Sequence, residues 1–172
     1  MRTKTGVRQW YWWPLCVLGL TALSCGGSET QSIDDLNSPQ TPPRGAAAIE
    51  PWIAQGFYRS WKCEPAPHPA SPFGAHGDNR VCSNDLLSAA GPGEFPVGAA
   101  SVKEIYSGPN VVGFSVSRHT AAGTSGSTWY WYERIGQDGG ATDAQGARVC
   151  VGCHSQAGNN RPGHDYVYTQ VR

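Results

Sequence analysis

Several features that define other classes of protein are scarce in this chain of 172 residues. Basic residues are scattered singly, so no nucleic-acid partner is expected. The longest apolar run, Trp10 to Leu23, is interrupted by Pro14 and is shorter than the about 20 residues that span a membrane. Methionine occurs only as Met1, so a mature chain without its first residues has no thioether to offer a metal.

The first residues have the pattern of an export signal, because Arg2, Lys4 and Arg8 precede the apolar run. The run ends in "ALSC" before two glycines, which resembles the lipobox of bacterial lipoproteins. We predict a lipoprotein signal peptide over residues 1–24, a lipid on Cys25, and a place in the bacterial cell envelope facing the periplasm or cell surface. Plain signal-peptide cleavage is the alternative. Loss of the signal leaves ten basic residues against thirteen acidic ones.

Residues 25–48 are polar, rich in Gly, Ser and Pro, and lack an apolar period, which predicts a lipidated, disordered tether. Residues 49–172 have the length of one small domain. Six cysteines fit this plan. Cys16 leaves with the signal, Cys25 takes lipid, and Cys63 pairs with Cys82 in an oxidising compartment.

The segment "RVCVGCHSQ" leaves Cys150 and Cys153 for special chemistry, next to His154. Zinc would need two further ligands, and no second Cys or His pair at short spacing exists. A redox disulfide normally lies at a strand-to-helix junction of a βαβ unit, unlike this pair. C-x-x-C-H in an exported chain instead indicates covalent haem c, with thioethers from the two cysteines and His154 as axial ligand of the iron. A disulfide-bonded surface lipoprotein is the fallback.

The second axial position has no methionine to fill it. A second histidine is available from His68, His76, His119 or His164, but all four lie in Gly- or Pro-rich surroundings typical of loops. We expect an open iron site that binds small molecules.

Hydrophobic periodicity predicts an α+β fold, mainly an antiparallel β-sheet with a few flanking helices. Helices are expected over 49–61 and, capped by Asn84 or Ser83, over 85–90. Strands are expected over 99–106, 110–118, 127–135 and 165–171. Alternation along "TWYWYE" places Trp129 and Trp131 on one face and Tyr130 and Tyr132 on the other.

The domain resembles the cytochrome P-460 family, a relative of cytochrome c-prime-beta. The motifs "GAHGDNRVCSND", "EFPVGAASVKEIY", an aromatic strand, "CVGCH" and "HDYVYT" follow in the family's order. The resemblance implies a homodimer with one haem c per chain, and a lysine bonded to a meso carbon of the haem, which matches Lys103. Asn84, His76, Asp165 and Tyr166 match further positions, which we interpret as structural.

One departure concerns the carboxylate that the hydroxylamine-oxidising members carry near the iron. The segment 111–123 contains no Asp or Glu, and Phe114 or Val116 is expected to cap the iron instead. The nearest acids in sequence are Glu104 and Glu133. The resemblance implies oxidation of hydroxylamine or nitric oxide, with a redox partner protein, or binding of such small nitrogen species. A non-enzymatic gas-binding or electron-transfer cytochrome c on the cell envelope is the alternative.

Overall fold

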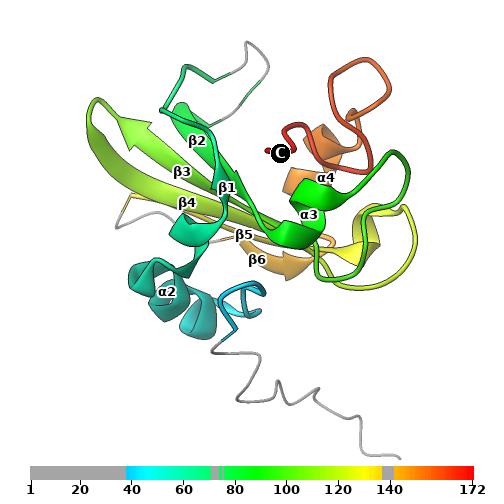
Figure 1. The fold of residues 1–172 in the computed structure, drawn as a ribbon, viewed down its shortest axis with the longest axis horizontal. Helices are drawn as coiled ribbons and strands as arrows, with labels where there is room; N and C mark the ends of the chain where they lie inside the picture. Colours follow the sequence, from blue (N-terminus) through cyan, green and yellow to red (C-terminus); the bar gives the residue numbers. More distant parts are fainter. Residues whose placement is uncertain (1–37, 71–73, 75, 137–141) are drawn as a thin grey trace, which may run out of the picture. The chain divides into compact units, whose positions relative to one another are not determined.

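The computed structural model describes residues 38–70, 74, 76–136 and 142–172, and its centre is one antiparallel sheet (Figure 1). The six strands are hydrogen-bonded in chain order: β1 Lys62–Cys63, β2 Asp78–Ser83, β3 Ala100–Ser107, β4 Asn110–His119, β5 Trp129–Ile135 and β6 Thr142–Gln145. The helices are α2 Ala46–Gln55, α3 Asp85–Ala89 and α4 Arg148–His154, with 3-10 turns η1 Phe57–Ser60 and η2 Gly126–Thr128. The predicted α+β class is confirmed.

The sheet separates two hydrophobic clusters, because alternate residues of a strand point to opposite faces. Tyr130 and Tyr132 pack with Trp52 and Ile49 of α2 on one face. Trp129 and Trp131 pack on the other face, where α4 lies. Figure 1 shows α2 and α4 on opposite sides of the strands. The predicted alternation along β5 is therefore confirmed.

Three of the four predicted strands correspond to β3, β4 and β5, and the hairpin between β3 and β4 turns at Gly108, which has φ 58°. Residues 165–171 do not form a strand, so that prediction is wrong; a pair of hydrogen bonds between His164 and Val167 closes a turn there. The predicted helix over 49–61 is interrupted at Gly56, which has φ 72° and ends α2. Asn84 caps α3, accepting from the backbone N–H of Leu87 at 3.0 Å.

The folded region begins before residue 49, where the sequence placed its start. Residues 38–42 form a strap whose carbonyl groups are held by side chains of the body. Trp52 and Trp61 donate their indole N–H groups to the carbonyls of Ser38 and Pro39, at 3.0 and 2.8 Å. Asn84 and Arg118 hold the carbonyls of Gln40 and Pro42, at 2.8 and 2.9 Å. Cys25 and the signal peptide lie outside the described residues.

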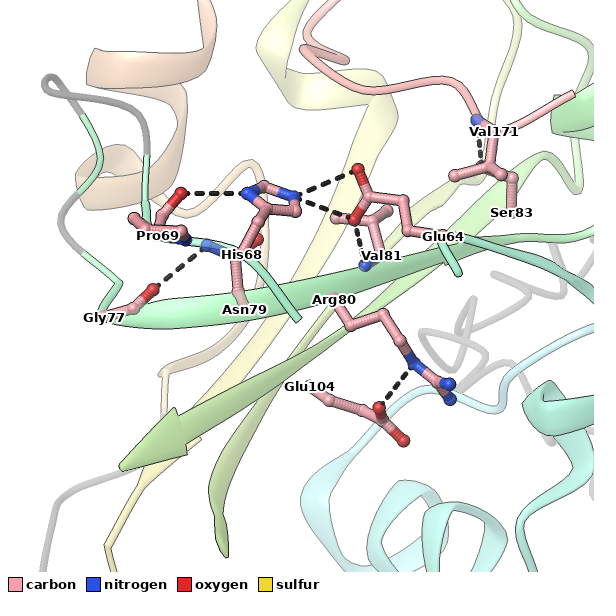
Figure 2. A network of polar contacts seen from close by, with 10 residues as sticks. All are labelled: Glu64, His68, Pro69, Gly77, Asn79, Arg80, Val81, Ser83, Glu104 and Val171. Atoms are coloured by element: carbon pink, nitrogen blue, oxygen red, sulfur yellow. Dashed lines mark hydrogen bonds and ion pairs between the residues drawn. The ribbon is translucent and has the colours of Figure 1, made fainter. Parts of the chain in front are cut away.

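The predicted disulfide between Cys63 and Cys82 is present and joins directly opposed residues of β1 and β2. It closes the loop that leads to β2. Figure 2 shows how this loop is fastened: the carboxylate of Glu64 accepts from the backbone N–H of Val81 at 2.7 Å and lies 3.1 Å from Nε2 of His68. His68 also donates from Nδ1 to the carbonyl of Pro69, and this bond raises the pKa of its imidazole.

Candidate functional site

A cavity of about 140 Å³ lies between α4 and the sheet. Its walls combine residues that the sequence had singled out separately: Cys150, Cys153 and His154 of α4, and Lys103 of β3. Trp131 and Tyr168 add aromatic surface. The structure therefore brings the C-x-x-C-H motif and Lys103 to one place.

Strand register accounts for the polar wall of this cavity. Lys103 is paired with Ser115, Ser115 with Glu133, and Glu133 with Thr142, so four neighbouring strands each contribute one residue to a single row. Directly opposed residues point to the same face of an antiparallel sheet. All four members of this row line the cavity.

The two cysteines of α4 are free thiols with different surroundings. Cys150 is partly buried and packs near Trp131 in the cluster on that face, whereas Cys153 is exposed. Burial raises the pKa of the Cys150 thiol to about 11, so it is protonated at neutral pH. Redox-active cysteines depend on a lowered pKa. The surroundings of Cys150 thus disfavour the redox alternative.

His154 is oriented by the turn that follows α4. Its Nδ1 atom donates a hydrogen bond to the backbone carbonyl of Tyr166 at 2.7 Å, and its ring contacts Trp131, with centroids 4.5 Å apart. Burial lowers the pKa of this imidazole to about 4, so the ring is neutral at physiological pH. Because a carbonyl can only accept, the proton sits on Nδ1. The lone pair of Nε2 is then free to coordinate a metal.

Lys103 is partly buried in the cavity wall, and this burial lowers the pKa of its amine. The negative charges of Glu133 and Glu64 act in the opposite direction, because they favour the ammonium form. Val102 and Glu104, its neighbours in β3, point to the other face: Val102 belongs to the cluster under α2, and Glu104 accepts from the phenol of Tyr58 at 2.7 Å. Lys103 therefore faces the cavity while both of its chain neighbours face α2 and η1.

A carboxylate and an imidazole meet in the cavity wall. Oε2 of Glu133 lies 2.7 Å from Nδ1 of His76, which precedes β2, and the two side chains are 23% and 18% exposed. From the sequence, His76 is expected to be a loop residue, and Glu133 is only one of the acidic residues nearest to the segment 111–123. The alternation of β5 places Glu133 on the same face as Trp131, but its position opposite Ser115 requires the strand register.

Phe114 and Val116 lie on the other face of the sheet. The ring of Phe114 contacts Tyr58, with centroids 6.1 Å apart, and Val116 is fully buried in the cluster under α2. The structure does not bring either side chain to the cavity that holds His154. The proposed cap over the iron therefore has no support from their placement.

The remaining candidate histidines are engaged elsewhere. His68 is at the loop beside Glu64, His119 is buried 3.1 Å from Oγ1 of Thr128, and His164 stacks on Phe95 at 4.3 Å. Within the described ranges, no group of three His, Cys, Asp or Glu side chains is arranged to hold a metal ion. None of the helices in that part of the chain is both long and apolar enough to cross a membrane.

The chain was compared with protein-family models, with curated proteins and with solved structures, and none of the three comparisons found a match.

Proposed function

We propose that this chain is an exported mono-haem c-type cytochrome of the cytochrome P-460 type, which oxidises or binds small nitrogen species such as hydroxylamine or nitric oxide at an open axial site. The observation that supports it is the convergence of Cys150, Cys153, His154 and Lys103 on one cavity. The lipid anchor on Cys25, a redox partner protein and a homodimer belong to the same proposal.

The residues present fit a covalently held haem. Cys150 and Cys153 occupy neighbouring turns of one short helix, so both sulfurs can form thioethers with a single macrocycle. His154 presents a neutral ring whose Nε2 lone pair is available. Trp131 and Tyr168 both contact that ring and offer aromatic surface, with centroids 4.5 and 5.0 Å away. When bound, the haem supplies an iron that takes electrons from a nitrogen substrate.

The polar row across the sheet favours oxidation over simple gas binding. Oxidation of hydroxylamine releases protons, and Glu133 is a carboxylate in the cavity wall that can accept one. Nδ1 of His76 lies 2.7 Å from that carboxylate. Lys103 lies in the same row and is our candidate for the additional bond to a meso carbon of the haem. Gas binding alone would require no proton acceptor.

The proposal is tested on protein purified from cells with a complete cytochrome maturation system. We expect a coloured protein whose haem stays attached after denaturation, and loss of that attachment in the Cys150→Ser/Cys153→Ser variant. Colourless wild-type protein would end the proposal. Reduction of an artificial electron acceptor on addition of hydroxylamine then distinguishes the oxidase from the gas-binding protein, which would show ligand spectra without turnover.

A further inference from the structure

Two consecutive residues after α4 adopt an unusual backbone conformation. Asp165 and Tyr166, with φ of 41° and 67°, are the non-glycine residues that have positive φ in the described part of the chain. Aspartate tolerates this left-handed region, but a bulky residue such as tyrosine rarely adopts it. Such a conformation persists only where the surroundings enforce it, and it often accompanies a functional contact.

Two features enforce the turn. The carboxylate of Asp165 accepts a hydrogen bond from the backbone N–H of Phe95 at 2.9 Å, which fastens the turn to the loop before β3. Gly163, with φ 90°, begins the turn where no side chain fits, since a Cβ atom there would overlap the carbonyl oxygen of Val167. Asp165 thus ties the turn to the loop before β3, and the missing side chain of Gly163 lets the backbone of the turn pack closely against Val167.

The consequence of this backbone is the direction of one carbonyl group. The Tyr166 carbonyl points at Nδ1 of His154, 2.7 Å away. Farther along the same segment, the phenol of Tyr168 donates to the carbonyl of Cys153. The segment therefore contacts the end of α4 at two points, the imidazole of His154 and the backbone carbonyl of Cys153.

We propose that Asp165 is a positioning residue that holds the Tyr166 carbonyl against His154 and thereby sets the reduction potential of the haem. This inference rests on the proposed function. A carbonyl that accepts from Nδ1 makes the imidazole a stronger electron donor through Nε2. A stronger donor stabilises ferric iron and lowers the potential. Asp165 touches neither iron nor substrate, and acts only through the turn.

The chain offers three informative substitutions at this position. Asp165→Asn keeps an acceptor for the Phe95 N–H and tolerates positive φ. Asp165→Gly adopts positive φ freely but has no acceptor, and Asp165→Ala lacks both properties. Asn84→Ala is the control for general loss of stability, because Asn84 caps α3 and lies outside the turn.

The measurements are the midpoint potential and the iron–histidine stretching frequency of the ferrous haem protein. Loss of an outer partner of a metal ligand typically changes binding or activity by roughly 10-fold or more. We expect Asp165→Ala and Asp165→Gly to shift the ferric–ferrous equilibrium about 10-fold toward ferrous, which is about 59 mV for one electron. The stretching frequency should fall with it. Asp165→Asn and Asn84→Ala should match the wild type.

Three results would overturn this inference. The first is an unchanged potential and stretching frequency in Asp165→Ala and Asp165→Gly. The second is an equal shift in Asn84→Ala, which would reflect general loosening. The third is failure of both Asp165→Ala and Asp165→Gly to fold while Asp165→Asn folds, which would make the residue purely structural. Absence of covalent haem from the wild type would instead remove the proposed function itself.

Discussion

Nδ1 of His76 lies 2.7 Å from Oε2 of Glu133, although the two residues come from a loop and a strand that are far apart in the chain. Lys103 stands in the same row as Glu133, with Ser115 of β4 between them. The carboxylate therefore has the His76 imidazole beside it and the Lys103 amine in the same row. A charged group in a partly buried wall needs such partners, because burial alone disfavours its charged form.

Substitution of Glu133 tests its role as proton acceptor. General-base catalysis contributes about 10²- to 10⁴-fold to a rate, so Glu133→Gln should lower hydroxylamine turnover by an amount in that range. Haem content and the spectrum of a bound gas should stay unchanged, since the amide keeps the shape of the side chain. Glu50→Gln is the matched control, because Glu50 bonds Tyr132 and Arg134 away from the cavity. Equal turnover in both variants would exclude Glu133 as the base.

Lys103 is tested by absorption spectroscopy. If its amine is bonded to the haem, Lys103→Ala should lose a strongly red-shifted band of the ferrous protein while the haem stays attached through Cys150 and Cys153. Lys62→Ala serves as the control, because Lys62 is exposed at the edge strand β1. An unchanged spectrum in Lys103→Ala would show that no such bond exists.

We predict a measurable loss of stability when the disulfide between Cys63 and Cys82 is removed. A bridge that spans 19 positions restricts the unfolded chain, and its removal should cost about 3 kcal/mol in the chain-entropy account. We expect the Cys63→Ala/Cys82→Ala variant to unfold at lower urea concentration by that free energy, with its haem spectrum intact. The comparison is wild-type protein with the bridge chemically reduced, which should show a similar loss. Identical urea midpoints for oxidised and reduced protein would contradict this prediction.

We predict that the free energy of unfolding decreases in alkaline solution because of the buried phenol of Tyr58. Burial, together with the hydrogen bond to Glu104, raises the pKa of its phenol from 10.0 to about 12. Above pH 10 the unfolded chain releases this proton before the folded protein does, so the free energy of unfolding falls as the pH rises toward 12. Tyr58→Phe has no such proton and should show a shallower fall between these pH values. Burial raises the pKa of Tyr130 in the same direction, so a residual slope should remain. Equal slopes in the two proteins would refute the assignment.

The elements that could be predicted from the sequence are those whose own residues favour the structure they adopt. β3, β4 and β5 are rich in Val, Ile, Tyr and Trp, and Asn84 is a favoured cap. β6, with the sequence "TDAQ", has no such signal and is a strand only because β5 pairs with it. The opposite happens at the C-terminus, where "DYVYTQV" reads as a strand although contacts with α4 and Phe95 bend it into a turn.

Some residues of the candidate site could likewise be predicted from the sequence, and others could not. Cys150, Cys153 and His154 are visible as a motif, and Lys103 followed from a resemblance between sequences. Glu133 and His76 could not be joined from the sequence, because their meeting depends on which residues lie opposite each other in the sheet and on the course of a loop. The expected place of Phe114 over the iron depended on the same information: neighbouring residues of β4 point to opposite faces of the sheet, and Ser115 is the one that lines the cavity.

The strap of residues 38–42 has a mechanical consequence. Four side chains from different parts of the body hold its carbonyl groups: Trp52 of α2, Trp61 after η1, Asn84 at the start of α3 and Arg118 of β4. A pull on the chain ahead of Ser38 would be shared among these four supports, none of which belongs to α4. Tension from the N-terminal side would thus be carried first by these supports, before it reached the helix with Cys150 and Cys153.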